Sequence, residues 1–307
     1  MRQIAFALTE RITMAWGLIR EMGHVSIQTN DIEGSIFDAT ELLGLRVTER
    51  TDNEVYLAAN SVHHELTYVQ SEVNGIHSLG LIAQNGDALR EIRRRVANEN
   101  FKIVSETPVS AGVQDGFSFI GPEGWVFEIY TGMQHNDRGL LSFGPDRYGH
   151  INFHPRDVRG MMEFLRRIFD FRLSDVIGDD YAYFMRCNPD HHGIALIKGQ
   201  GTFHHHAWQV QSIGDLAKLG DRLGAAGREL IWGPVRHGAG HNIAAYYVET
   251  SGAVVELYTD LEQIYDDERD PIIWGEDENW WNMWSNRRTE DFRTFGIPTV
   301  TELKTFI

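Results

Sequence analysis

The 307-residue chain has little of several features that mark particular protein classes. Its single cysteine, Cys187, excludes an intramolecular disulfide and fits a reducing compartment, so we expect a cytoplasmic location. No apolar run approaches the roughly 18–20 residues that span a bilayer, and we expect no membrane partner. Positive charge is also scarce: 28 Lys and Arg against 44 Asp and Glu give a net charge of −16, which argues against a nucleic-acid partner.

Histidine, by contrast, is abundant. The chain has 14 histidines, and many stand next to one another, as in His63-His64, His191-His192 and His204-His205-His206. Because imidazole is the commonest side-chain ligand of transition metals, these groups direct the search to a metal site.

The chain also repeats itself. Four short segments recur at offsets of 126, 128, 129 and 128 residues. They are 23–27 with 149–153, 59–64 with 187–192, 76–79 with 205–208, and 127–130 with 255–258. We therefore predict two copies of one unit, over 22–132 and 148–260, joined by a polar, Gly-rich linker at 133–147.

Both copies show the same order of expected elements. Helical spacing of apolar residues predicts helices over 158–169 and 213–226, and short apolar runs predict strands at 181–185, 193–197, 206–210 and 254–258. Each copy is then a pair of β-α-β-β-β units. We predict an α+β fold in which each module forms a cupped or barrel-like mixed sheet.

The two ends of the chain lie outside the repeat. Residues 1–21 are expected to form an N-terminal helix. Residues 261–307 form a tail rich in tryptophan, which we expect to cover the mouth of a module, to pack against another subunit, or simply to join the core.

Equivalent positions of the second copy offer two imidazoles and a carboxylate. His150 lies on its first strand, His206 on the corresponding strand of its second half, and Glu256 on its last strand. Two histidines and one carboxylate on one side of an ion are typical of non-heme Fe(II) sites. A single strand histidine is usually structural, so the prediction depends on the joint pattern.

One motif in the second copy is specific. Residues 233–237 read Gly-Pro-Val-Arg-His, Tyr246 follows His237 by 246 − 237 = 9 residues, and Glu256 follows Tyr246 by 256 − 246 = 10. Together with Cys-Asn-Pro-Asp-His-His at 187–192, this resembles the type I extradiol catechol dioxygenases of the vicinal-oxygen-chelate superfamily, most closely their dihydroxybiphenyl branch. The resemblance covers essentially the whole chain, because that family also carries a non-catalytic N-terminal copy.

The resemblance implies the activity and the cofactor. His150, His206 and Glu256 would hold Fe(II), with Mn(II) as the alternative, and the partners would be a catechol and O₂. Members of the family are commonly multimeric, so we expect a homo-oligomer.

The resemblance also implies roles for residues around the metal. His192 would face the substrate and oxygen and later deliver a proton, His237 would bind or deprotonate the catechol, and Tyr246 would hydrogen-bond the oxygen that becomes the ring-cleavage carbonyl. Asn152 would face the substrate, and His241 would support the site from behind. His191, His204 and His205 are interpreted as structural or solvated.

The expected substrate is a neutral catechol with an aryl or alkyl substituent. Related enzymes for carboxylated catechols use arginines around the pocket and in the C-terminal tail. Trp232 stands five residues before His237, where some of them carry such an arginine, and Phe184 stands eight residues before His192. The tail stretch 274–280 is acidic and aromatic, with no arginine between it and Arg287. A carboxylated catechol, such as homoprotocatechuate or dihydroxycumate, is the alternative substrate. A glyoxalase-like isomerase, a hydroquinone dioxygenase and a non-catalytic binding protein of the same superfamily are the alternative functions.

The first copy serves as an internal comparison. It keeps His24, His77 and Glu128 at the positions taken to be ligands, but Val109 stands in place of His237 and Ser118 in place of Tyr246. We therefore predict that it does not catalyse, and its metal binding stays an open question at this point.

Overall fold

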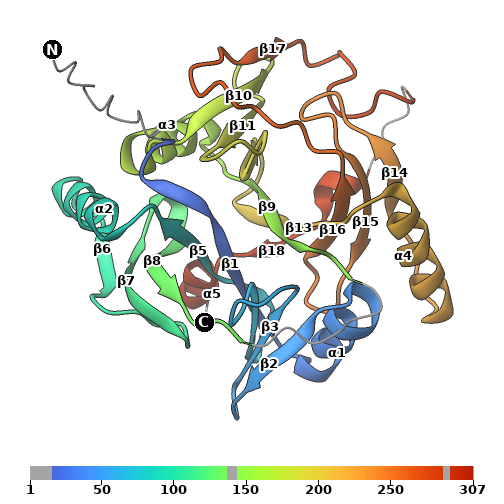
Figure 1. The fold of residues 1–307 in the computed structure, drawn as a ribbon, viewed down its shortest axis with the longest axis horizontal. Coiled ribbons are helices and arrows are strands. Elements are labelled where there is room, and N and C mark those ends of the chain that lie inside the picture. The colour runs from blue at the N-terminus through green and yellow to red at the C-terminus, as the bar shows by residue number, and fades with distance from the viewer. Residues whose placement is uncertain (1–15, 137–143, 286–290, 307) are drawn as a thin grey trace, which may run out of the picture.

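The computed structural model describes residues 16–136, 144–285 and 291–306 (Figure 1). Its strands form two sheets, one for each copy of the repeat. Among the described residues, no helix combines the length and the apolar character needed to cross a membrane.

The first sheet has eight strands in the order β2-β3-β4-β1-β5-β8-β7-β6. They are β1 (Ile19–Thr29), β2 (Arg46–Arg50), β3 (Glu54–Ala58), β4 (Leu66–Gln70), β5 (Gly75–Ala83), β6 (Lys102–Ser105), β7 (Val113–Ile120) and β8 (Val126–Met133). Helix α1 (Ile32–Phe37) and the π-helical segment η1 (Asp38–Leu43) connect β1 to β2, and α2 (Gly86–Asn98) connects β5 to β6. A short 3₁₀ turn, η2 (Pro122–Gly124), precedes β8.

The second sheet repeats this arrangement in the order β14-β15-β16-β13-β9-β12-β11-β10-β17. Its strands are β9 (Arg147–His154), β10 (Arg172–Ile177), β11 (Ala182–Arg186), β12 (Ile194–Ile197), β13 (Thr202–Gln209), β14 (Trp232–Arg236), β15 (Ile243–Val248), β16 (Val254–Thr259) and β17 (Ile272–Trp274), with β18 (Ile297–Pro298) beside β13. Helix α3 (Val158–Phe169) follows β9, and α4 (Ile213–Ala225) follows β13.

The predicted fold class is confirmed. In each sheet two β-α-β-β-β units meet at an antiparallel pair, β1 with β5 and β9 with β13. Each unit also contains one parallel pair, for example β9 with β12, so the sheets are mixed. The helix predicted over 158–169 is α3, whose apolar face (Met161, Phe164, Leu165 and Ile168 among others) is buried.

The two ends of the chain depart from the predicted elements. Residues 1–15 lie outside the described part of the chain, and of the N-terminal helix predicted over 1–21, residues 19–21 belong instead to β1. The C-terminal tail contacts both modules. It adds β17 to the edge of the second sheet, forms the 3₁₀ turn η3 (Phe292–Thr294), and ends in α5 (Val300–Phe306), which contacts β5 of the first sheet.

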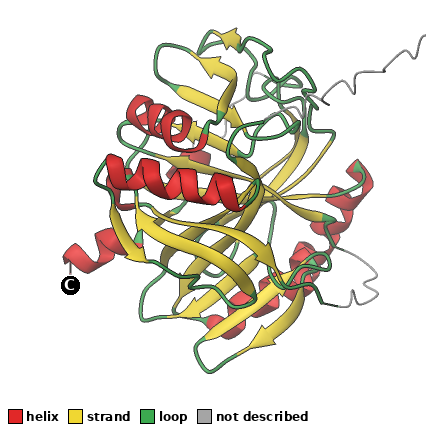
Figure 2. Ribbon diagram, turned by 60° about the vertical axis from the view of Figure 1, so that its left-hand side comes forward, coloured by secondary structure: helices red, strands yellow, loops and turns green. Residues whose placement is uncertain are grey.

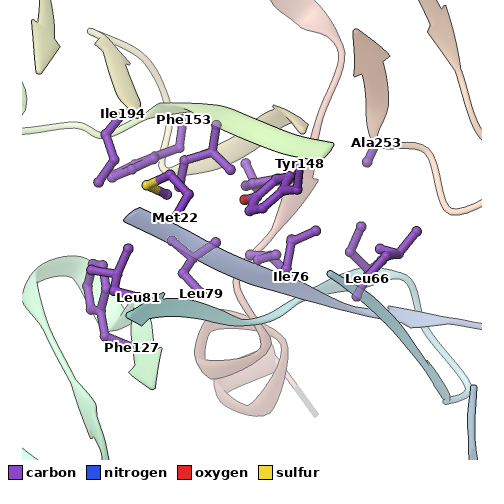
Figure 3. Close-up of a cluster of buried hydrophobic side chains, with 14 of the residues drawn as sticks. Met22, Leu66, Ile76, Leu79, Leu81, Phe127, Tyr148, Phe153, Ile194 and Ala253 are labelled. Atoms are coloured by element: carbon purple, nitrogen blue, oxygen red, sulfur yellow. The ribbon is translucent and has the colours of Figure 1, made fainter. Parts of the chain in front are cut away.

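One continuous apolar core joins the modules. Figure 2 shows the strands running through the molecule, with helices packed against them. At the junction, β1 contacts β9, and Met22 lies among the side chains of both sheets, near Phe153 and Ile194 (Figure 3). Because this core is shared, the first module supports the strand β9 that carries His150.

Candidate active site

One row of paired residues crosses five neighbouring strands of the second sheet, from β14 to β9. The pairs along it are Trp232 with Tyr246, Tyr246 with Glu256, Glu256 with Ala207, and Ala207 with His150. Directly paired residues project from the same face of a sheet, so these side chains share one side. That side lines a cavity of about 370 Å³, within the usual range of small-molecule sites.

His150, His205 and Glu256 form a cluster in this cavity. Their ligand atoms all lie within 4.8 Å of one another, and all three residues are buried. Glu256 Oε2 lies 3.2 Å from His150 Nε2 and 3.0 Å from His205 Nε2. We call these three residues the triad.

The predicted ligand His206 is wrong on geometry, and His205 takes its place. Ala207 belongs to the row that contains His150 and Glu256, and side chains alternate along a strand. His205 therefore points into the cavity and His206 points away. His206 instead accepts a hydrogen bond from the Trp208 indole at Nδ1 (2.7 Å), and its Nε2 lies 3.5 Å from the buried carboxylate of Glu249.

The triad fits a divalent metal ion. Metal–donor bonds of about 2.1 Å at right angles place neighbouring donor atoms about 3.0 Å apart, close to the two distances measured from Glu256 Oε2. Burial raises the pKa of Glu256, but His150 and His205 outweigh burial and hold it well below its ordinary value. The site thus offers an ionised carboxylate and two imidazoles, the ligand types of non-heme Fe(II) and Mn(II) centres.

His192, which the resemblance places next to the substrate and oxygen, lies beside the triad. It belongs to the loop between β11 and β12, and its ring centre is 4.3 Å from that of His150. Its Nδ1 contacts Nδ1 of His191 at 3.0 Å, and Nε2 of His191 lies 3.1 Å from Asp175 Oδ1. Burial, with His150 and His191, lowers the pKa of His192 well below its ordinary value, so the ring is neutral at pH 7.

His237 and Tyr246 form a hydrogen-bonded pair on the other side of the cavity. His237 Nδ1 lies 2.6 Å from the carbonyl oxygen of Trp281, which can only accept, so Nδ1 carries the proton. His237 Nε2 then accepts from the Tyr246 hydroxyl at 2.7 Å. Burial lowers the pKa of His237, while burial and Glu256 raise the pKa of Tyr246 well above its ordinary value, so both groups are neutral.

Two asparagines complete the polar lining. Asn152, predicted to face the substrate, lines the cavity, and its Oδ1 is buried without a hydrogen-bond partner among the described residues. His241 was predicted to support the metal ligands from behind, but the neighbouring Asn242 makes that contact instead. Its Nδ2 donates to Glu256 Oε1 at 3.0 Å. His241 is exposed and does not line the cavity, because the loop enters a left-handed conformation there (φ 56°).

The remaining cavity wall is aromatic. Phe184 and Trp232 line it as predicted, and the tail adds Trp280, Trp281, Phe292 and Arg293. Phe292 and Arg293 were not predicted, because nothing local in the sequence marks where a tail of this length returns to the fold. Arg287, the first arginine after the acidic stretch 274–280, lies outside the described residues.

In the first module a loop fills the corresponding position. Glu128 Oε2 lies 3.3 Å from His24 Nε2, but Ser110 contacts both, with its Oγ 2.5 Å from Oε2 and 3.3 Å from Nε2. The backbone N–H groups of Val109 and Ser110 donate to Glu128 Oε1, each at 3.1 Å. The carboxylate is thus fully hydrogen-bonded by its own chain.

The register also removes a ligand from this module. Ser26 pairs with Ser78, just as Asn152 pairs with His205, so Ser78 holds the position of the third ligand. His77 is half-buried next to it, with Nδ1 3.2 Å from Ser78 Oγ. Within the described residues, the triad of the second module is the only cluster of His, Cys, Asp and Glu with metal-ligand spacing.

Comparisons with known proteins agree with this arrangement. A family model described as the Glyoxalase/Bleomycin resistance protein/Dioxygenase superfamily matches residues 21–129 and again 147–257. Metapyrocatechase from Pseudomonas sp. (strain CF600) is 24% identical over 287 residues, which cover 85% of this chain and 92% of that protein. Biphenyl-2,3-diol 1,2-dioxygenase from Paraburkholderia xenovorans (strain LB400) is 27% identical over 261 residues, or 78% and 87% of the two chains.

A solved structure extends the likeness to three dimensions. The Mn(II)-bound glyoxalase from Novosphingobium aromaticivorans superposes with a TM-score of 0.82 at 26% identity, and the match covers 88% of this chain and 91% of that one. The family model matches once in each sheet, so both halves of the repeat are copies of the same domain. The chain therefore belongs to the glyoxalase/bleomycin resistance protein/dioxygenase superfamily.

Proposed function

We propose that this protein is an extradiol catechol dioxygenase, which opens an aromatic ring beside a vicinal diol and adds both atoms of O₂ to the product. The observation that carries the proposal is that the triad shares one cavity with His192, His237 and Tyr246. The names of two relatives agree with this proposal, since one is a metapyrocatechase and the other is a biphenyl-2,3-diol 1,2-dioxygenase. The reaction is balanced without a reductant, because the ring supplies the four electrons that O₂ accepts.

The triad would hold Fe(II), with Mn(II) as the alternative. When bound, the ion would be chelated by the two oxygens of the catechol and would couple the ring electronically to O₂. His150, His205 and Glu256 would hold it at the wall of the cavity. Fe(II) is proposed from the motif; the Mn(II)-bound neighbour supports the alternative.

The protein's own groups then orient the catechol and move its protons. Neutral His237 accepts from Tyr246, so a catechol hydroxyl that approaches this pair meets a hydrogen-bonded acid and base. His192 lies on the opposite side of the cavity, against His150, where it can hold a proton for the ring-opening step.

The wall also supports a neutral substrate. Phe184, Trp232 and Trp281 present aromatic surface, which favours an aryl or alkyl substituent on the catechol. Arg293 is the one Lys or Arg among the described residues that line the cavity, and it is already engaged. Its guanidinium donates to Tyr181 Oη at 2.6 Å and to the carbonyl of Lys198 at 2.8 Å. A carboxylated catechol would have to compete for these contacts.

The proposal is tested by activity and a matched pair of variants. Protein purified anaerobically and reconstituted with Fe(II) should consume O₂ and form a yellow ring-opened product from 2,3-dihydroxybiphenyl. His205→Ala should abolish both signals, and His241→Ala, at an exposed position, should keep them. Preference for homoprotocatechuate would refute the neutral substrate, and absence of O₂ uptake with every catechol would refute the dioxygenase.

An isomerase is the second candidate, because the Mn(II)-bound structural neighbour is a glyoxalase. Such a reaction rearranges the adduct of a 2-oxoaldehyde and a thiol, and it consumes no oxygen. Loss of methylglyoxal–glutathione adduct at a metal-dependent rate, without O₂ uptake from any catechol, would favour this candidate over the first.

We also infer that the protein forms homo-oligomers. The tail exposes several large apolar side chains, including Tyr265 (68% exposed), Ile273 (67%) and Trp284 (54%). Exposed apolar surface of this kind is common at subunit interfaces. Light scattering coupled to size exclusion should give a mass of at least twice the 35.1 kDa of one chain, and a mass of 35.1 kDa would contradict the inference.

A further inference from the structure

A chain of two imidazoles leads from the C-terminal tail to the triad. His204 Nε2 lies 2.7 Å from the carbonyl oxygen of Phe292, and His204 Nδ1 lies 2.9 Å from Nδ1 of His205. His205 Nε2 in turn lies 3.0 Å from Glu256 Oε2. Three consecutive polar contacts thus connect a backbone carbonyl of the tail with the metal-binding cluster.

The hydrogens in this chain follow from the groups at its two ends. A carbonyl oxygen can only accept, so His204 Nε2 carries a hydrogen. A His205 that binds metal must offer a lone pair at Nε2, so in the metal-bound protein its hydrogen lies on Nδ1. That hydrogen is directed at His204 Nδ1, 2.9 Å away, which can accept it while His204 Nε2 donates to the Phe292 carbonyl.

We propose that His204 is a positioning residue for the metal centre. It donates from Nε2 to the Phe292 carbonyl and accepts at Nδ1 from His205, which holds His205 in the tautomer whose Nε2 is free to bind metal. The opposite tautomer of His205 would place a hydrogen on Nε2 and block coordination. Metal affinity should therefore depend on the hydrogen bond between His204 of β13 and Phe292 of the tail. This inference rests on the proposed metal centre.

The same Nδ1–Nδ1 contact occurs at two other neighbouring pairs of histidines. His191 and His192 contact through Nδ1 at 3.0 Å, with His191 Nε2 3.1 Å from Asp175 Oδ1. His63 and His64 contact through Nδ1 at 2.9 Å, with His63 Nε2 2.9 Å from Glu49 Oε2. In both pairs Nε2 of the first ring lies close to a carboxylate oxygen. The pair at 204 and 205 differs in that its second ring belongs to the triad.

Metal affinity tests the proposal without relying on turnover. Isothermal titration with Mn(II) should give a Kd for His204→Phe about 10–100-fold weaker than for the wild type, the usual effect of losing a residue that orients a ligand. His204→Asn should stay within about threefold, because its side-chain oxygen can still accept from His205 Nδ1–H. His154→Phe is the matched control, since His154 stacks on His204 (4.7 Å) without contacting the triad, and it should also stay within about threefold.

Tautomers can be observed directly in the wild-type protein. Long-range ¹H–¹⁵N spectra of histidine-labelled protein loaded with diamagnetic Zn(II) should show His204 protonated on Nε2 and His205 on Nδ1. His204 protonated on Nδ1 would overturn the proposal even if His204→Phe did not fold. An unchanged Kd for Mn(II) in folded His204→Phe would also overturn the proposal. The metal centre itself would be refuted if the wild type bound no Mn(II), or if His205→Ala bound it as tightly as the wild type.

Discussion

The opposite orientations of His205 and His206 predict a crossed result when each is replaced by alanine. His205→Ala removes a donor atom of the triad from the edge of the cavity. His206→Ala removes a fully buried ring that has no contact with the triad. One variant should therefore lose metal binding, and the other should lose stability.

The magnitudes follow from the contacts of each ring. A metal ion at 100 times its Kd stabilises the native state by about 2.7 kcal/mol, and we expect the wild type and His206→Ala to gain this increment and His205→Ala to lose most of it. In metal-free protein, His206→Ala leaves the buried Trp208 indole N–H unpaired and opens a cavity, which costs about 3–5 kcal/mol. His205→Ala costs about 1 kcal/mol, because Glu256 keeps its hydrogen bonds to His150 and Asn242.

Urea unfolding followed by circular dichroism measures both quantities. Each protein is unfolded with Mn(II) at saturating concentration and again with a chelator, and the difference in the free energy of unfolding is the metal increment. If His205→Ala kept this increment while His206→Ala lost it, the register of β13 and the assignment of the triad would be wrong. Equal metal increments in all three proteins would refute the triad as the binding site.

Three further predictions concern the acid–base pair, the cavity wall and the first module. Tyr246→Phe should lower kcat for ring cleavage about 100-fold and leave the Kd for Mn(II) unchanged, and a kcat within threefold of the wild type would contradict the role of the hydroxyl. Trp232→Ala, which removes the ring stacked on Tyr246, should raise KM for 2,3-dihydroxybiphenyl about tenfold but KM for catechol little, and equal increases would contradict recognition of an aryl group. In the first module burial raises the pKa of Glu128, but His24 and Ser110 lower this pKa to about 2. The ionised Glu128 therefore stabilises the fold fully above pH 4.5, and this stabilisation is lost as the pH falls toward 2. Glu128→Gln should therefore lower the free energy of unfolding at pH 7 by about 3 kcal/mol, as measured by urea titration. The free energy of unfolding of this variant should also fall less steeply between pH 5 and 3 than that of the wild type. An unchanged pH dependence would show that the contacts of Glu128 contribute nothing to stability.

The sequence by itself determined the fold class and most of the acid–base group. Recurring segments at nearly constant offset predicted two modules of one kind, because a repeated pattern of apolar residues repeats the same packing. The spacing from His237 to Tyr246 to Glu256 carries the family resemblance that implied one site for these residues, and the register pairs Tyr246 directly with Glu256. Spacing works here because β15 and β16 are joined by a short turn, so that sequence distance fixes the pairing.

Only the tertiary structure decided which residue of a run of similar residues faces the cavity. Among His204, His205 and His206 the answer depends on the pairing of β13 with β9 and β16, and β13 has irregular pairing near Phe203. Because side chains alternate along a strand, an error of one residue reverses the predicted face. The loop at His241 and Asn242 gave the same one-residue error, since a left-handed residue turns the chain in a way that spacing does not reveal. Contacts between distant segments, such as Phe292 with His204, follow from the path of the tail across the fold and have no local signal in the sequence.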